Sequence, residues 1–229
     1  MLRSHLMKCM ALLAMSLVFA GAASAGSYSF TGTFTTDDQL QEFLFTIGSS
    51  TTFTAVTLSY AGGTNQAGAI IPEGGFDPFL AIFNSSGTLL ALNDDGTGFV
   101  PIDPSTGAAS DSYLSLSTLA AGTYTLVLSQ TYNQPYGPTF ADGYSEAGNP
   151  NYTADAFGCG SGYFCDPFGT TNRTGNWALD IDNVSSASEF GEPMTTPEPE
   201  SILLFGSGIA GLILLLWRRR FKAAYIAGY

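Results

Sequence analysis

Basic residues are almost missing from the middle of this 229-residue chain. Between Lys8 and Arg218 the only lysine or arginine is Arg173, and the only histidine of the whole chain is His5. That interval also holds all nineteen carboxylates, so it carries one positive and nineteen negative charges, a net charge of −18. A protein that binds a nucleic-acid duplex needs clustered lysine and arginine to neutralise phosphates, so the composition excludes nucleic-acid binding.

The same shortage excludes several kinds of active site. Histidine-based catalytic triads, Schiff-base lysines and histidine-ligated metal centres all need residues that the interval does not contain. Only 11% of all residues are charged, well below the usual quarter. We therefore expect a protein that is not an enzyme.

The first 25 residues resemble an export signal. A charged start is followed by an apolar run from Cys9 to Ala20 and by the small-residue pattern Ala23-Ser24-Ala25. Such a stretch is typical of a secretory signal peptide, here cut by signal peptidase before Gly26. An uncleaved anchor helix is the alternative, but the apolar run is short for a membrane span.

A second apolar segment lies near the C-terminus. Residues 202–217 contain no charge, and Arg218, Arg219 and Arg220 follow at once. Sixteen residues reach about 24 Å as a helix, and neighbouring residues from about 201 on can extend it toward the bilayer's hydrocarbon thickness of about 30 Å. Because short basic loops stay cytoplasmic, we expect the tail 223–229 inside and the acidic part outside. A buried globular helix would need a polar face, which these positions lack.

The order of features at this end resembles a known sorting signal. Pro197-Glu198-Pro199, the apolar helix and the basic cluster 218–222 together resemble the PEP-CTERM signal of Gram-negative bacteria. The resemblance implies processing by an exosortase, after a stage in which the C-terminal helix anchors the protein in the inner membrane. Residues 197–222 would form the signal, behind a linker at 189–196.

Between residues 26 and 188 the pattern is that of an all-β domain. Apolar residues alternate with hydroxyl residues, as half-buried strands require, and Gly, Asn, Asp and Pro separate the runs. Many short strands at this spacing predict an antiparallel β-sandwich of the jelly-roll or Greek-key type. The expected strands are 28–34, 42–47, 53–60, 79–83, 88–91, 113–116, 123–129 and 177–181.

One part of this domain resembles a family of β-sandwiches found in secreted bacterial proteins. The runs Phe76-Asp77-Pro78-Phe79-Leu80, Asn93-Asp94-Asp95-Gly96 and Ala121-Gly122-Thr123-Tyr124-Thr125-Leu126 are similar to the pre-peptidase C-terminal domain. The resemblance covers residues 76–130. It implies a β-sandwich that is mostly non-catalytic, with some relatives that bind calcium or matrix polymers.

The stretch 133–176 has no regular pattern but contains Cys159 and Cys165, the only cysteines left after signal cleavage. In an oxidising compartment we expect them to form a disulfide. A metal site with two thiolates is the alternative, but no histidine or third cysteine is present to complete a zinc tetrahedron.

Acidic residues occur in and near the run Asn93-Asp94-Asp95-Gly96. Asp77, Asn93, Asp94 and Asp95, with Asp103 and Asp111 as further candidates, offer the oxygen ligands that Ca²⁺ prefers. A solvated turn, in which Asn and Asp cap backbone groups, explains the same residues without a metal. Calcium therefore stays one of two interpretations.

The irregular stretch and its borders are rich in aromatic residues, which fill cores or, when exposed, stack on sugar rings. These residues are Tyr132, Tyr136, Phe140, Tyr144, Tyr152, Phe157, Tyr163, Phe164, Phe168 and Trp177.

We expect an exported envelope protein of structural or adhesive type associated with extracellular polysaccharide. The alternatives are a carbohydrate- or calcium-binding module and, less favoured, a glycoside hydrolase, which needs two placed carboxylates.

Overall fold

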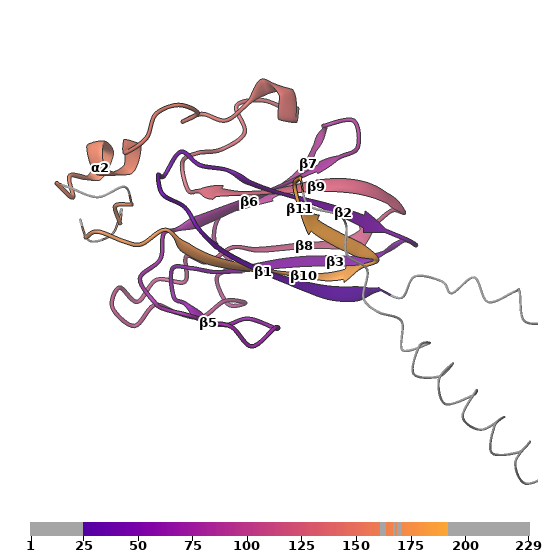
Figure 1. Ribbon diagram of the computed structural model, residues 1–229, viewed down its shortest axis with the longest axis horizontal. Helices are drawn as coiled ribbons and strands as arrows, with labels where there is room; N and C mark the ends of the chain where they lie inside the picture. Colours follow the sequence, from indigo (N-terminus) through magenta and orange to yellow (C-terminus); the bar gives the residue numbers. More distant parts are fainter. Residues whose placement is uncertain (1–24, 161–163, 167, 169–170, 192–229) are drawn as a thin grey trace, which may run out of the picture. The chain divides into compact units, whose positions relative to one another are not determined.

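The computed structural model describes residues 25–160, 164–166, 168 and 171–191. Two antiparallel sheets make up most of it (Figure 1). One has four strands in the order β1-β10-β3-β8, and the other has five in the order β11-β2-β9-β6-β7. The elements are β1 (Gly26–Thr33), β2 (Gln41–Ile47), β3 (Thr51–Leu58), β4 (Gly63–Thr64), β5 (Ile70–Ile71), β6 (Pro78–Asn84), β7 (Leu89–Asn93), β8 (Tyr113–Leu119), β9 (Gly122–Gln130), the 3₁₀ turn η1 (Phe140–Asp142), α2 (Tyr152–Phe157), β10 (Asn176–Val184) and β11 (Ser186–Glu189).

The core lies between the two sheets, and alternation along the strands explains it. In β2, Phe43, Phe45 and Ile47 are buried while the residues between them are partly exposed, because successive side chains of a strand point to opposite faces. Phe45 stacks on Phe53 of the other sheet with ring centroids 4.8 Å apart. Each fully buried side chain of this size contributes about 1.5–3 kcal/mol, so such pairs dominate the stability of the sandwich.

Strand β6 differs because both of its faces are covered. Phe79, Ala81 and Phe83 point away from the main core and pack with Val127 and Tyr144 in a second apolar cluster. Tyr144 belongs to the irregular stretch between β9 and β10, so part of that stretch covers the outer face of the five-stranded sheet. This packing gives ordered structure to a region without a strand pattern.

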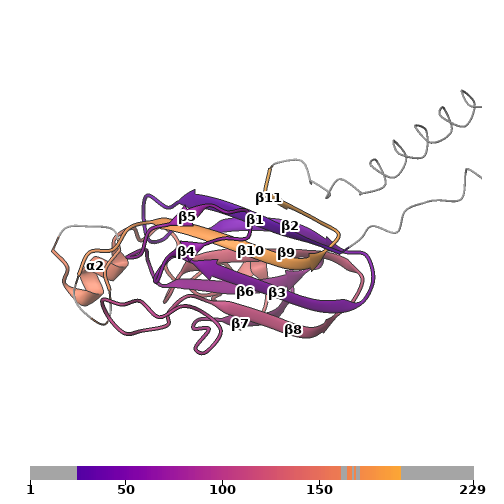
Figure 2. The same cartoon turned by 90° about the horizontal axis from the view of Figure 1, so that it is seen from below.

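The candidate site lies where an edge of one sheet meets an edge of the other. Strand β7 ends the five-stranded sheet and β8 ends the four-stranded sheet, and the two edges lie side by side (Figure 2). The segment between them, residues 94–112, therefore crosses from one sheet to the other at the open side of the sandwich.

The all-β antiparallel class expected from the sequence is confirmed, and each of the eight expected strands is present. β4 and β5 form a third, two-stranded sheet, and pairing in all three described sheets is antiparallel. One isolated bridge, between Gly75 and Thr174, is parallel. Within the residues described, no helix is long and apolar enough to cross a membrane. The expected signal peptide at 1–25, apart from Ala25, lies outside the described residues, as do the helix at 201–217 and the sorting signal at 197–222.

Candidate binding groove and cation site

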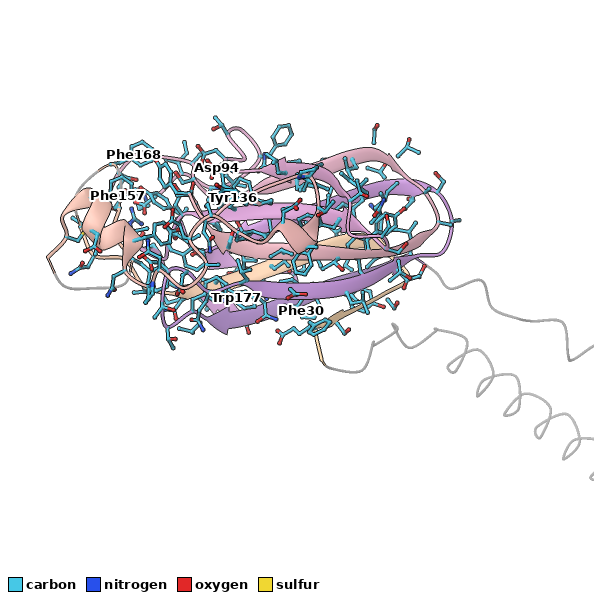
Figure 3. The ribbon with its side chains drawn as sticks, turned by 90° about the horizontal axis from the view of Figure 1, so that it is seen from above. Phe30, Asp94, Tyr136, Phe157, Phe168 and Trp177 are labelled. Atoms are coloured by element: carbon cyan, nitrogen blue, oxygen red, sulfur yellow. A yellow bond between two sulfur atoms is a disulfide. The ribbon has the colours of Figure 1, made fainter. Side chains whose placement is uncertain are left out.

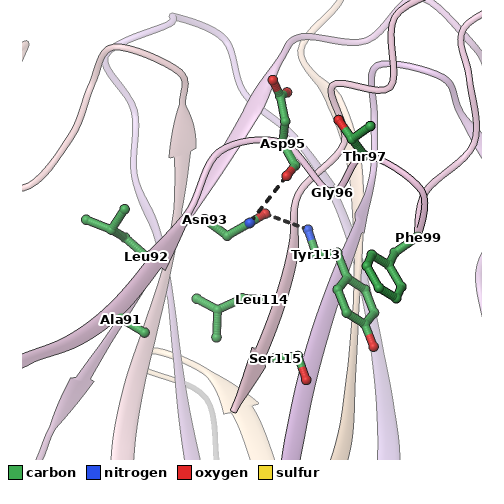
Figure 4. Close-up of a pocket in the computed structure, with 10 residues that line it drawn as sticks. All are labelled: Ala91, Leu92, Asn93, Asp95, Gly96, Thr97, Phe99, Tyr113, Leu114 and Ser115. Atoms are coloured by element: carbon green, nitrogen blue, oxygen red, sulfur yellow. Dashed lines mark hydrogen bonds between the residues drawn. The ribbon is translucent and has the colours of Figure 1, made fainter. Parts of the chain in front are cut away.

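The turn that follows β7 is fastened to the start of β8. The side-chain oxygen of Asn93 accepts a hydrogen bond from the N–H of Tyr113 at 2.7 Å, and its amide donates to the carbonyl of Asp95 at 3.3 Å (Figure 4). The N–H of Gly96 donates to the carbonyl of Asp111 at 2.8 Å. These bonds hold the turn in one conformation against the edge strand.

A surface groove with a volume of about 450 Å³ lies beside this turn, between the two edge strands. Its most prominent wall is the ring of Phe99, which is 71% exposed. That ring stacks on Tyr113 with centroids 4.6 Å apart and planes 9° from parallel, as the two neighbouring rings in Figure 4 show. The other lining residues are Ala91, Leu92, Asn93, Asp95, Gly96, Thr97, Leu114 and Ser115.

The structure brings together two of the four predicted calcium ligands. Asp77 and Asp94 meet at Thr131, whose N–H donates to the carbonyl of Asp77 at 2.8 Å and whose hydroxyl donates to Oδ1 of Asp94 at 2.7 Å. Asn93 and Asp95 are instead lining residues of the groove, and the side chain of Asp95 also hydrogen-bonds Ser110. Among the described residues, no group of three or more His, Cys, Asp or Glu side chains is arranged to hold a metal.

Asp77 is the unusual member of this pair. Its side chain is only 6% exposed, and Oδ1 has no hydrogen-bond partner. Burial raises the pKa of Asp77 well above its ordinary value, and the negative charges of Asp94 and Asp95 raise it further. Burial also raises the pKa of Asp94, against the hydrogen bond from Thr131. A cation beside Oδ1 would offset the repulsion between these carboxylates and would give Oδ1 a partner.

Asp111, a further candidate ligand, serves the backbone instead. Its carboxylate accepts N–H groups from Ser59 at 2.6 Å and Ala61 at 3.0 Å, and a hydroxyl from Thr57 at 3.2 Å. Burial raises the pKa of Asp111 to about 6, even though these donors act to lower it. The side chain therefore anchors the end of β3 to the segment that leads into β8.

Asp103, the remaining candidate, belongs to a buried ion network that sequence reasoning missed. Arg173 bonds Asp103 at 2.7 Å and Asp166 at 2.6 Å, and its guanidinium lies 3.7 Å from the ring centroid of Tyr60. The arginine side chain is 5% exposed. The signal was present in the sequence, because the only basic residue of a strongly acidic domain is a natural partner for buried carboxylates.

The aromatic residues of the irregular stretch divide between core and surface. Tyr144, Tyr152, Phe164 and Trp177 are buried, whereas Tyr132, Tyr136 and Phe168 are exposed. Figure 3 shows Trp177 inside the sandwich and Phe157 and Phe168 at the end that carries α2. A second surface cavity, of about 470 Å³, is lined by Tyr132, Glu146, Asn149, Tyr152, Asp155, Ala156 and Phe157.

The predicted disulfide is confirmed. Cys159 and Cys165 are bonded, with their Cα atoms 5.7 Å apart. Cys165 is buried, and its N–H donates to the hydroxyl of Thr153 at 3.0 Å. The bridge therefore ties the segment after α2 back to the helix.

Comparison with known families identifies the C-terminal segment. Residues 195–220 match the PEP-CTERM protein-sorting motif. The chain thus carries the sorting signal that its Pro-Glu-Pro, apolar and basic segments resemble. A motif of this kind implies an exported cell-envelope protein that an exosortase processes.

The search of curated proteins found no match. Among solved structures, one similar chain is the pre-peptidase C-terminal domain of collagenase from Bacillus anthracis. The two are 9% identical with a TM-score of 0.31, and the match covers 71% of this chain and 89% of the other.

Proposed function

We propose that the mature protein is a non-catalytic adhesive or structural element of an extracellular polysaccharide matrix. The observation that carries this proposal is the sorting motif at 195–220, which follows an acidic β-sandwich in the sequence. Signal peptidase and exosortase are the processing enzymes. The inner membrane of a Gram-negative bacterium holds the C-terminal helix until processing.

The bonding of four buried carboxylates supports a non-catalytic role. Asp37 accepts two N–H groups and a hydroxyl from Asn151 and Thr153, and Asp111 accepts donors at the end of β3. Asp103 and Asp166 are paired with Arg173. A hydrolase needs a carboxylic acid and a carboxylate that are free to face a substrate, whereas these four hold the fold together.

Mass spectrometry of the mature product tests this proposal. We expect an N-terminus at Gly26 and a C-terminus within or before the sorting motif, with the product in the polysaccharide fraction of the culture. A strain that lacks its exosortase should retain the unprocessed chain in the membrane. An intact chain in the cytosol, with both ends uncut, would contradict the proposal.

A calcium-binding module is the second candidate, and Asp77 favours it. An unpaired carboxylate oxygen in a buried site is destabilising by about 1–3 kcal/mol. Calcium prefers six to eight oxygens, and Asp77, Asp94 and main-chain carbonyls of the 93–95 turn would supply part of them. Divalent cations held there would also link an acidic surface to an acidic polymer. Isothermal titration with CaCl₂ tests this candidate, and no heat of binding at millimolar calcium would remove it.

A further inference from the structure

The ring of Phe99 is held rigidly in an exposed position. The ring stacks on Tyr113, and the backbone N–H of Phe99 donates to the carbonyl of Gly96 at 2.8 Å. The next residue, Val100, is buried and fixes the chain on the other side. A large apolar side chain that is 71% exposed gains little from folding, so a fixed orientation of this kind suits contact with a ligand.

Gly96 lets the turn lie directly on β8. A Cβ at this position would stand 2.6 Å from Cβ of Tyr113 and 2.8 Å from Cγ1 of Val100. Only glycine fits there without displacement of the strand or of the valine. Because the turn is already packed and hydrogen-bonded, the groove needs little further ordering when it binds, and preorganisation of this kind raises affinity.

Polar residues also line the groove. Asp95, Thr97 and Ser115 are exposed lining residues that come from the turn and from β8. One carboxylate and two hydroxyls therefore offer acceptors and donors in the same groove as one flat apolar ring. A pyranose ring has the matching character, with an apolar C–H face and hydroxyl groups at its rim. The groove volume lies in the range of small-ligand sites.

The charges of the site select among polysaccharides. Asp95 lines the groove and Asp94 precedes it, whereas Arg173, the only basic residue between Lys8 and Arg218, is buried in its own ion network. A uronate or phosphate group would enter without a positive partner and close to a carboxylate, which is repulsive. A sugar without charge meets no such penalty.

We propose that the groove formed by Phe99, Tyr113 and Asp95 binds neutral hexopyranose units of a polysaccharide. The apolar face of one sugar lies on the exposed face of Phe99, and its hydroxyls bond Asp95, Thr97 and Ser115. This inference rests on the proposed adhesive function and specifies the ligand class for it.

The cavity at Tyr132 and Phe157 fits such a ligand less well. Its two rings are tilted by 51° to each other, and Glu146 and Asp155 both line it. It presents no exposed ring stacked on a second ring as the groove does. Tyr136, an exposed ring of the irregular stretch that lines neither the groove nor this cavity, serves as the control in the experiment.

The test measures binding of the full-length chain, purified in a detergent micelle, to three polymers, first in calcium-free buffer and then with millimolar CaCl₂. Laminarin and galactomannan are the neutral probes, and alginate is the anionic probe. Affinity electrophoresis and isothermal titration give the dissociation constants. We expect the wild type to bind at least one neutral polymer and to bind alginate far more weakly.

The variants locate the site. Phe99→Ala should weaken neutral-polymer binding by about tenfold or more, while Phe99→Tyr should retain most of it. Tyr136→Ala removes a ring that is 79% exposed but lies outside the groove, and should leave binding unchanged. Asp95→Ala removes a carboxylate and keeps both rings, and it should also weaken binding. Thermal melts verify that each variant is folded.

The outcomes separate this inference from the function on which it rests. Binding of neutral polymer that survives Phe99→Ala, or that is lost in Tyr136→Ala, would place the site elsewhere and leave the adhesive function intact. Binding of alginate alone, in buffer with calcium, would overturn the neutral-sugar groove but support adhesion. If the wild type binds none of the three polymers with or without calcium, both proposals fail.

Discussion

Arg173 donates to Asp103 over 2.7 Å although the two residues are 70 positions apart in the sequence, and both side chains are buried. The same guanidinium bonds Asp166, which directly follows the disulfide-bonded Cys165. One arginine thus joins the 94–112 crossover, near the groove, to the irregular stretch. The guanidinium is the positive charge that compensates both buried carboxylates.

We predict that Arg173→Met destabilises the protein by about 3–5 kcal/mol, because it leaves two buried carboxylates without a cation. Chemical denaturation followed by tryptophan fluorescence measures the change. Arg173→Lys should be intermediate, since a single ammonium group cannot bond both carboxylates as the guanidinium fork does. Equal stability of the methionine variant and the wild type would show that the network contributes nothing.

Asp103 predicts a loss of stability in acid. Burial alone would raise its pKa, but hydrogen bonds from Ser105, Arg173 and Thr106 lower it to about 2. Because the folded pKa lies below the ordinary value, the stabilisation is complete above about pH 4 and is lost as the pH falls toward 2. Unfolding midpoints measured between pH 2 and 5 should therefore fall steeply, and more steeply than in Asp103→Asn.

The strands could be predicted because their signal is local. Phe43, Phe45 and Ile47 alternate with partly exposed residues, and this period alone identifies β2. Strand β11 was missed because Ser-Ala-Ser-Glu has no such alternation, and its pairing with β2 supplies its structure. Helix α2 was missed because six residues give too little periodicity, and Asp37, far away in the sequence, accepts N–H groups at its start.

The candidate site was predicted only in part, for the same reason. Asp77 and Asp94 were found from their residue types, and their meeting at Thr131 follows from the pairing of β6 with β9. Phe99 lies in a turn without a strand pattern, and its partner Tyr113 begins the next strand. A groove between two sheet edges depends on which strands end each sheet, and the alternation pattern does not contain that information.

The position of Gly96 predicts a specific intolerance. Gly96→Ala should destabilise the protein by about 1–3 kcal/mol, since its Cβ would overlap Tyr113 and Val100. Gly98→Ala is the matched control, because a Cβ there meets no atom within 4 Å and only its φ of +87° opposes it. Denaturation curves should rank the control as milder. The reverse order would mean that the turn is not packed on β8.

The disulfide predicts a modest and local effect. Cys159→Ser with Cys165→Ser opens a small ring, and chain entropy gives a loss of about 2 kcal/mol. Hydrogen exchange should increase most around α2, because the bridge ties the segment that follows it. Groove binding should be unaffected, since no groove residue lies in that stretch. An equal increase of exchange in β6 and β9 would contradict this local role.

Asp77→Asn should have opposite effects with and without calcium. Without metal, the folded pKa of Asp77 lies above its ordinary value, so the wild type loses stability as the pH rises from about 4 toward neutral. The amide removes the charge and its repulsion with Asp94, and we expect a higher midpoint than the wild type at pH 7. With millimolar CaCl₂ the wild type should gain stability and the variant should not, because the amide lacks the charged oxygen. MgCl₂ serves as the control, since magnesium prefers small octahedral sites. A calcium effect of the same size in both proteins would place the cation away from Asp77.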